Sequence, residues 1–252
     1  MIELKSPREI GKMREAGRIV ALALAEVEKH LRPGVATEDL DHLVRDFVKS
    51  RNGTLLFYNY HGFPANTCIS INEEVVHGIP SPTRALEEGD ILSIDVGVGF
   101  DGFCGDSART FAVGEISDEA RDLLGVCENS LQQGIDQSRP GNRVSDISRA
   151  IQEYAEGEGY SVVKKFVGHG IGRKMHEPPQ VPNYVDKGVL REDPILKEGI
   201  VLAIEPMVNV GSEDVETLSD NWTVVTRDRR LSAHFEHTVA VTADGPQILT
   251  LP

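Results

Sequence analysis

A weak internal repeat limits the possible fold of this chain more than any other feature of its sequence. Residues 86–95 align with residues 196–205, and leucine, glutamate, glycine, leucine and isoleucine recur in place. The two copies lie 110 residues apart, and each ends on a carboxylate, Asp95 in the first and Glu205 in the second. An apolar strand that ends in an acid therefore occurs twice, which indicates two similar halves.

Each copy of this segment is preceded by two amphipathic helices. An Arg-Pro-Gly stop separates the helices of each pair, at residues 32–34 and, 107 residues later, at residues 139–141. Residues 6–9 form a capping box with proline at the first helical position, which is typical of a helix start. We expect the four helices to be capped by Ser6, Thr37, Ser117 and Ser145.

This plan predicts one pseudo-symmetric α+β domain over residues 1–252, with halves at about 1–115 and 116–252. We expect the halves to share an antiparallel sheet, with helices on its outer face and the functional site on the other face, between the halves. The alternative is two independent domains, but no linker rich in proline, glycine or serine divides the chain.

Composition excludes several classes of protein. With 40% hydrophobic and 26% charged residues the chain is typical of a globular protein, and its net charge of −14 argues against DNA as a partner. Most of this acidity favours solubility, although some carboxylates could hold metal. The most apolar run, residues 19–25, is far shorter than the roughly 20 residues of a membrane span. Three cysteines without a CxxC pair suit a reducing compartment, so we expect a cytoplasmic protein without membrane contact.

Two aspartates lie inside predicted strands. Residues 91–98 form a buried strand, a turn follows near residues 100–102, and the returning strand brings Asp106 close to Asp95. One such aspartate would more often be a structural hydrogen-bonding group. Two buried carboxylates across a hairpin repel each other unless a cation neutralises them, so the pair favours metal binding.

The second half supplies matching candidate ligands. Glu205 ends an apolar strand, Glu236 begins the final strand, and His169 lies among glycines that allow close backbone approach. Four carboxylates and one imidazole suit two divalent ions bridged by carboxylates. Such an oxygen-rich site favours Co, Mn, Fe(II) or Zn over copper.

These residues lie in short motifs that follow one another along nearly the whole chain. In order, the motifs resemble the signature of the type I methionine aminopeptidases. They include residues 68–73, 76–80, 168–172, 175–178, 204–206, 232–233 and 235–238. The family has the pita-bread fold, which agrees with the duplicated halves. The resemblance implies an enzyme that removes the initiator methionine from peptides and nascent chains when the second residue is small.

The resemblance also implies a role for each candidate ligand. Asp95 would chelate one ion and His169 the other, while Asp106 and Glu236 would bridge the pair. Glu205 would bind a metal and accept a proton from the bridging water. The chemistry implied is attack on the first peptide bond by a hydroxide that two metal ions activate.

Further positions match the family's substrate and cation sites. His77 and His176 would contact the scissile amide and stabilise the tetrahedral intermediate. Asn72 and Ser232 match a site for one monovalent cation. The methionine side chain would be bound by Tyr60, Phe63, Cys68 and Trp222, with Phe57 near the edge of the pocket.

Three residues depart from the family pattern. Met175 stands where phenylalanine is frequent, His234 where glutamine is common, and Phe63 where tyrosine is frequent. None of them is a candidate metal ligand, so they bear on fine substrate preference.

Rival interpretations remain. An X-Pro dipeptidase or aminopeptidase P-like enzyme shares the metal ligands, but such chains usually carry an additional N-terminal domain, whereas here the first helix starts at Ser6. A non-enzymatic binding protein of the same fold would typically have lost metal ligands. We expect a monomer that associates transiently with the ribosome. The basic clusters at 164–165 and 227–230 suit either RNA contact or, more commonly, solvated surface charge.

Overall fold

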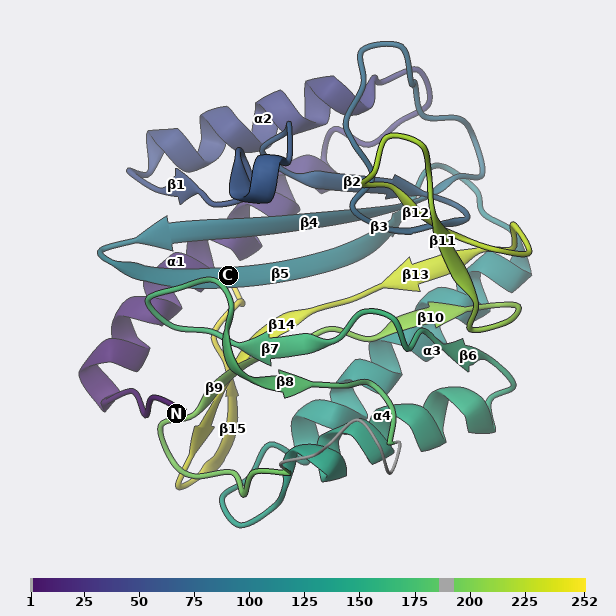
Figure 1. Ribbon diagram of the computed structural model, residues 1–252. Helices are drawn as coiled ribbons and strands as arrows, with labels where there is room; N and C mark the ends of the chain where they lie inside the picture. Colours follow the sequence, from purple (N-terminus) through teal and green to yellow (C-terminus); the bar gives the residue numbers. More distant parts are fainter. Residues whose placement is uncertain (1, 186–192) are drawn as a thin grey trace.

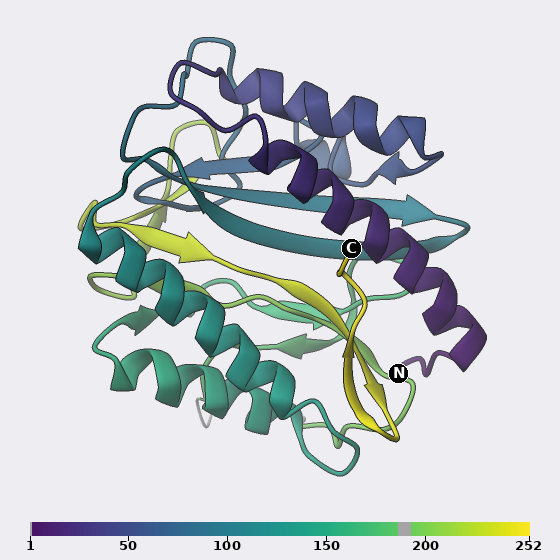
Figure 2. The same ribbon diagram turned by 180° about the vertical axis from the view of Figure 1, so that it is seen from behind.

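Two pairs of helices cover one side of the strands. The computed structural model describes residues 2–185 and 193–252. In Figure 1, α1 and α3 pass behind the strands, and in Figure 2, seen from behind, they cross in front of them. The helices are α1 (Pro7–Glu28), α2 (Thr37–Ser50), α3 (Asp118–Asp136), α4 (Val144–Gly157) and the short 3-10 helix η1 (Tyr60–Gly62).

The described strands pair in four antiparallel sheets, each of which can be followed in Figure 1. In the first half, β4 (Ile91–Phe100) pairs with β5 (Phe103–Ala112), β2 (Cys68–Ile71) and β1 (Thr54–Leu55). In the second half, the sheet order is β15 (Gly245–Ile248), β14 (His237–Thr242), β9 (Val201–Ile204), β7 (Gly168–Gly170) and β8 (Glu177–Val181). One smaller sheet has the order β13 (Ser232–His234), β10 (Met207–Asn209) and β6 (Ser161–Val162). The other has the order β11 (Val215–Thr217), β12 (Val224–Thr226) and β3 (Glu74–Val76).

The same hydrogen bonds recur in the two halves. The Gly34 amide donates to the Leu86 carbonyl at 2.8 Å, and at the equivalent positions the Gly141 amide donates to the Leu196 carbonyl at 3.0 Å. Both glycines have a positive φ, +88° and +94°, which glycine adopts without strain. Each Arg-Pro-Gly stop thus returns the chain to the start of the repeated strand segment. The duplicated α+β architecture predicted from the sequence is confirmed.

Two of the four predicted helix caps are confirmed. Ser6 forms the capping box, and the Ser117 hydroxyl accepts a hydrogen bond from the third amide of α3. The predictions for Thr37 and Ser145 were wrong, since α2 begins at Thr37 itself and α4 begins one residue before Ser145. The reason is that both hydroxyls have other partners: Thr37 donates to a loop carbonyl, and Ser145 donates to the Asp193 carboxylate at 2.7 Å.

The halves meet along β5 and the segment that leads into β14, as both ribbon views show. The sequence predicted that the halves share a sheet, and β3 of the first half does pair with β12 of the second. In the described residues no ladder joins β5 to β14, and side-chain hydroxyls contribute to the contact there. The Asp106 amide donates to the Thr238 hydroxyl at 3.0 Å, and that hydroxyl donates back to the Asp106 carbonyl at 2.7 Å. The Glu236 amide donates to the Ala108 carbonyl at 2.9 Å, which fixes the backbone of both acidic residues.

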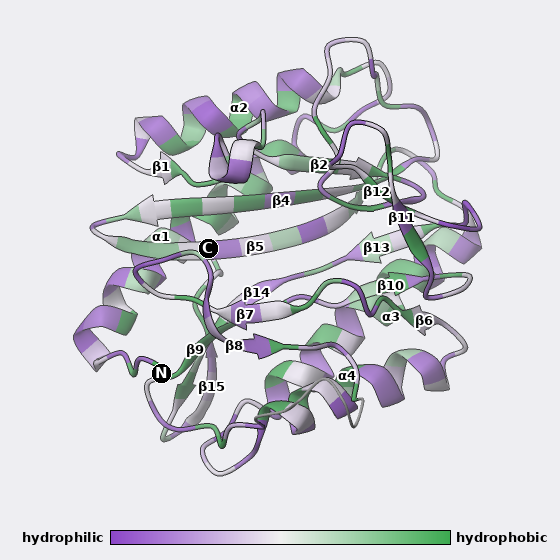
Figure 3. Ribbon diagram, viewed as in Figure 1, coloured by the Kyte–Doolittle hydropathy of each residue, from purple (hydrophilic) through white to green (hydrophobic). Residues whose placement is uncertain are grey.

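Each half has its own apolar core between helices and strands. In the first half, Val20, Leu24 and Val44 of α1 and α2 pack with Ile94 of β4. In the second half, α3 and α4 pack against β9 and β14. Figure 3 shows hydrophobic and hydrophilic residues alternating along α2, as expected for a helix with one covered face. No helix in the described parts of the chain is long and apolar enough to cross a membrane.

Two glycines of α1 give a test of this packing. A Cβ atom at Gly17 would lie 2.4 Å from the Leu249 carbonyl oxygen, whereas one at Gly11 would meet nothing within 4 Å. We expect Gly17→Ala to lower the free energy of unfolding by about 1–3 kcal/mol through overpacking. The matched control Gly11→Ala should raise it by about 0.5–1 kcal/mol, because alanine is the better helix former. Urea unfolding measures both, and equal effects of the two substitutions would contradict the packing described here.

Candidate active site

One cavity of about 260 Å³ collects residues from both halves of the chain. All five candidate metal ligands line it, and so do both candidate amide-binding histidines and all the candidate pocket residues. Its walls are formed by Phe57, Tyr60, His61, Phe63, Cys68, His77, Asp95, Asp106, His169, Met175, His176, Glu205, Trp222 and Glu236.

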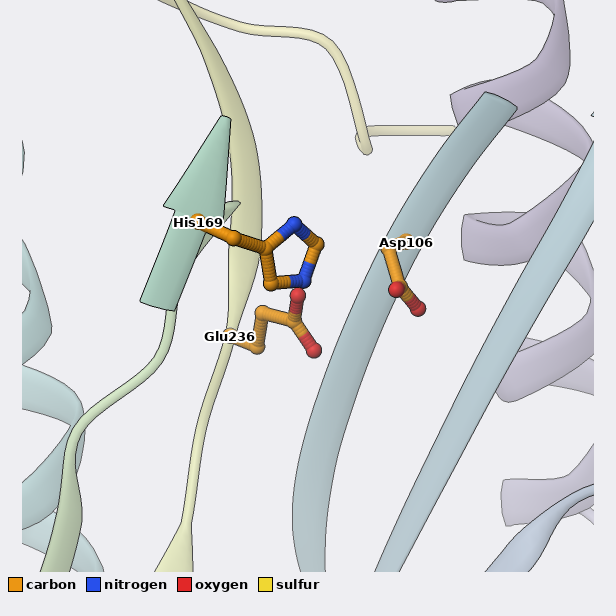
Figure 4. A group of neighbouring side chains, drawn as sticks. All are labelled: Asp106, His169 and Glu236. Carbon is orange, nitrogen blue, oxygen red and sulfur yellow. The ribbon is translucent and has the colours of Figure 1, made fainter. Parts of the chain in front are cut away.

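Three of these side chains converge closely. Asp106 comes from β5, His169 from β7, and Glu236 from the segment between β13 and β14. One potential ligand atom from each lies within 4.8 Å of the other two, and all three residues are buried. Figure 4 shows the three side chains directed into the space between these elements. One carboxylate of the first half thus meets a carboxylate and an imidazole of the second.

Glu205 adjoins this group on the side of His169. It follows β9 directly, and β9 pairs with β7 so that Ala203 lies opposite His169. The Nε2 atom of His169 is 3.5 Å from Oε1 of Glu205. The other ring nitrogen, Nδ1, lies 2.9 Å from the Gly170 carbonyl oxygen. A hydrogen bond from Nδ1–H to this carbonyl leaves the Nε2 lone pair free for a metal ion.

Asp95 completes the acidic wall from β4. In the β4–β5 ladder, Asp95 lies opposite Ala108 and Gly97 lies opposite Asp106. Since directly opposed residues point to the same face, the two aspartates occupy diagonal positions on one face. This is the hairpin arrangement that the sequence predicted.

Burial of four carboxylates in one place has an electrostatic cost. Burial is the main cause that raises the pKa of Asp95, Glu205 and Glu236 well above the usual range, and the nearby Asp106 raises each of them further. The pKa of Asp106 is itself raised to about 7, again mainly by burial. Near neutral pH the cluster therefore cannot carry four negative charges unless positive charge lies among them.

The hydrogen-bonding pattern fits cations at this place. Buried oxygens of Asp95, Asp106 and Glu236 have no hydrogen-bond partner in the described residues. Buried acceptors without partners are costly unless a positive group contacts them. Carboxylate oxygens with a neutral imidazole nitrogen are a donor set for divalent first-row metals. The residues present therefore fit divalent cations.

His77 and His176 lie beside this acidic group. His77 follows β3 and has a positive φ of +60°, a strained conformation of a kind that concentrates at functional sites. His176 precedes β8, and its ring centroid is 4.1 Å from that of His169. Burial, with a contribution from His176, lowers the pKa of His77 to about 4, and burial also lowers the pKa of His176. A neutral imidazole keeps one N–H to donate and one nitrogen to accept.

An apolar pocket adjoins the two histidines. The rings of Phe63 and Trp222 meet edge to face with centroids 5.1 Å apart, and Cys68 is buried beside them. The Tyr60 hydroxyl lies 2.7 Å from Nδ1 of His176, within hydrogen-bond distance. Met175, one of the departures from the family pattern, is also part of this cluster. Aromatic rings and sulfur atoms form a suitable wall for an unbranched apolar side chain.

Some placements were not predicted from the sequence. His61 lines the cavity, and its ring meets that of Tyr60 edge to face at 4.5 Å. The only indication in the sequence is that His61 directly follows Tyr60, a predicted pocket residue. Asn72 and Ser232 contact each other outside the cavity lining, where the Ser232 amide donates to the Asn72 carbonyl at 2.9 Å. The Ser232 hydroxyl is buried without a partner in the described residues.

The chain is similar to known proteins over most of its length. Residues 11–243 match the model of metallopeptidase family M24. Methionine aminopeptidase 1 of Bacillus subtilis is 53% identical over 250 residues, which cover 99% of each chain.

Solved structures agree with this similarity. The crystal structure of methionine aminopeptidase from Rickettsia prowazekii superposes with a TM-score of 0.96 and 43% identity, and all of both chains is covered. Prolidase from Pyrococcus furiosus superposes with a TM-score of 0.78 at 21% identity, and 99% of this chain covers 65% of that one. At 21% identity, the similarity to prolidase shows a shared fold and nothing more.

The repulsion within the acidic cluster leads to a prediction. In metal-free protein near pH 7, Glu236→Gln should raise the free energy of unfolding by about 1 kcal/mol, since it removes one charge from a strained site. Because the pKa of Asp106 rises from 3.8 to about 7 on folding, the folded parent binds the additional protons, and its stability falls as the pH increases between these values. The gain should therefore be small near pH 4 and largest at neutral pH.

Urea unfolding of chelator-treated parent and variant at the two pH values measures this difference. Adding Mn²⁺ should then stabilise the parent and have much less effect on the variant. A variant that is less stable than the metal-free parent at neutral pH would contradict the electrostatic account.

Proposed function

The chain belongs to metallopeptidase family M24, and from this premise we propose how it removes the N-terminal methionine of peptides and nascent chains. The observation that carries the proposal is the convergence of Asp106, His169 and Glu236 within 4.8 Å in a cavity that is also lined by an apolar pocket. Charged groups for catalysis and a wall for an apolar side chain thus share one space.

We assign the metal ligands to both halves of the chain. Asp95 and His169 would each hold one of two divalent ions, and Asp106 and Glu236 would bridge them. When bound, these ions supply an acidified water as nucleophile near neutral pH. Glu205 would help to hold an ion and accept a proton from that water, because its carboxylate lines the cavity and lies 3.5 Å from Nε2 of His169.

His77 and His176 would act on the substrate amide rather than on metal. Both line the cavity next to the acidic group, and His176 is held by the Tyr60 hydroxyl at 2.7 Å. A neutral imidazole can direct its N–H to the carbonyl oxygen of the scissile bond, where negative charge develops. For this role the orientation of the imidazole N–H matters more than a positive charge on the ring.

The pocket of Tyr60, Phe63, Cys68 and Trp222 would bind the methionine side chain. We infer that the free α-amino group enters among the carboxylates, which attract a positive or polar group. The second residue then lies near His77, and this ring is already packed edge to face against Phe166 and Trp222. Little room is left for bulk at that position, so small second residues are preferred.

The rival functions are not favoured. Methionine aminopeptidases match the whole chain at 44% to 54% identity, whereas the prolidase similarity at 21% shows the fold alone. A binding protein that has lost catalysis would not need four buried carboxylates and an imidazole in one cavity.

We further propose the setting in which the enzyme works. Residues 1–252 would form one catalytic domain that acts as a monomer in the cytoplasm, because its nascent-chain substrates arise there. Three buried free cysteines are consistent with a reducing compartment. A transient association with the ribosome would bring new chains to the cavity. A monovalent cation near Asn72 and Ser232 would give the buried Ser232 hydroxyl a partner.

The split between metal ligands and amide-binding groups can be tested with His77→Ala. Loss of a donor to the developing oxyanion should lower kcat by about 100-fold or more. Metal content, measured by elemental analysis after loading with Mn²⁺, should stay at the parent's level. Asp106→Asn is the matched control, since it should lose bound metal as well as activity. A large loss of metal in His77→Ala would mean that His77 is a ligand.

Substrate choice tests the function itself. Metal-loaded protein should trim Met-Gly, Met-Ala and Met-Ser peptides, while Met-Leu, Met-Lys and formyl-Met peptides resist. A clash at the second residue makes a difference in kcat/KM of about 100-fold or more plausible. Mass spectrometry of each peptide before and after incubation measures this, with chelator-treated protein as the inactive control. Faster cleavage of Ala-Pro-Ser than of Met-Ala-Ser would move the chain to the X-Pro enzymes.

A further inference from the structure

His234 is a buried histidine next to the catalytic group to which no role has been assigned. It ends β13, and only 2% of its surface is exposed. Its Nε2 atom has no hydrogen-bond partner in the described residues. A buried polar atom without a partner calls for an explanation, because its desolvation is not compensated.

The strand direction turns this side chain towards the site. Successive side chains of an extended segment point to opposite faces. Ala233 and Phe235 pack into the apolar core with α3. Ser232, His234 and Glu236 therefore face the other way, on the side where Glu236 meets Asp106.

Glu205 lies between two imidazoles. Its Oε1 atom is 3.5 Å from Nε2 of His169, and its Oε2 atom is 4.0 Å from Nε2 of His234. The side chain of Glu205 is 13% exposed and that of His234 is 3% exposed, so water has little access to this contact. The 4.0 Å separation is longer than a hydrogen bond, but catalytic hydrogen bonds are often long before ligands bind and shorten afterwards.

We propose that His234 is a positioning residue whose Nε2–H donates to Oε2 of Glu205 and so leaves Oε1 for the cation beside His169. This inference rests on the proposed function of Glu205 as proton acceptor and ligand. It assigns different tasks to the two carboxylate oxygens. The hydrogen bond to Oε2 fixes the orientation of the carboxylate group, while Oε1 remains available for the cation.

Ligation of metal by His234 itself is the competing explanation. The geometry favours donation, because the two imidazoles lie nearest to different oxygens of Glu205, His169 to Oε1 at 3.5 Å and His234 to Oε2 at 4.0 Å.

Substitutions of His234 by side chains of different length test whether an N–H at the position of Nε2 is needed. The amide nitrogen of glutamine lies as many bonds from Cβ as Nε2 of histidine, whereas that of asparagine is one bond shorter. We expect His234→Leu and His234→Asn to lower kcat on Met-Ala-Ser by about 10- to 100-fold, with KM changed less than about threefold. His234→Gln should recover most of the activity that His234→Leu loses.

A spectroscopic readout distinguishes a hydrogen bond from ligation. Electron spin echo modulation of Mn²⁺-loaded protein counts the imidazole nitrogens bound to metal. We expect one, from His169, in the parent and the same one in His234→Gln. Loss of a nitrogen signal in His234→Gln would show that His234 binds metal and would overturn the proposal.

The control is His237, a half-buried histidine at the start of β14. Nδ1 of His237 lies 2.8 Å from the Thr250 hydroxyl, away from Glu205. His237→Leu should lower the melting temperature but leave kcat of the folded protein within about threefold.

Each outcome decides something. If His234→Leu does not fold, His234→Asn against His234→Gln makes the same comparison. Equal kcat in the parent and His234→Leu, or equal impairment in His234→Gln and His234→Leu, overturns the role of Nε2–H. A parent that does not cleave Met-Ala-Ser counts instead against the proposed function.

Discussion

The mutual repulsion of four buried carboxylates is the constraint on which the rest of this structure depends. Asp95 and Asp106 lie on β4 and β5, Glu205 follows β9, and Glu236 lies between β13 and β14. Burial raises the pKa of all four, and the nearby Asp106 raises the pKa of the other three further. Without a cation, their repulsion would destabilise the folded protein. The packing of helices against strands in each half holds the four side chains in place despite this repulsion.

The duplication explains how one short chain can build such a site. Each half contributes an apolar strand segment that ends in an acid. The halves are joined by the pairing of β3 with β12 and, between β5 and β14, by hydroxyl and backbone hydrogen bonds. The Thr238 hydroxyl both accepts from and donates to the backbone of Asp106. The junction thus fixes the backbone position of Asp106, a candidate metal ligand, directly.

The sequence predicted the halves, the caps at Ser6 and Ser117 and the hairpin of Asp95 and Asp106, because these depend on local patterns. It could not predict the true starts of the second helices, since the hydroxyls of Thr37 and Ser145 bond to residues distant in the chain. The family resemblance named the cavity residues, but His61 and the environment of His234 became visible only in three dimensions. Contacts between segments far apart have no periodicity that a single sequence displays.

The contact between Tyr60 and His176 links binding of the substrate side chain to the chemistry at the amide. Tyr60 both lines the pocket proposed for the methionine side chain and lies within hydrogen-bond distance of the ring proposed to act on the amide. The two functions therefore cannot be altered independently at this position. An engineer who enlarges the pocket at Tyr60 to admit another side chain also releases His176, so altered selectivity here comes with slower chemistry. Phe63, whose ring packs against Trp222, lines the same proposed pocket, and a substitution there would change the shape of the pocket without removing the Tyr60 hydroxyl.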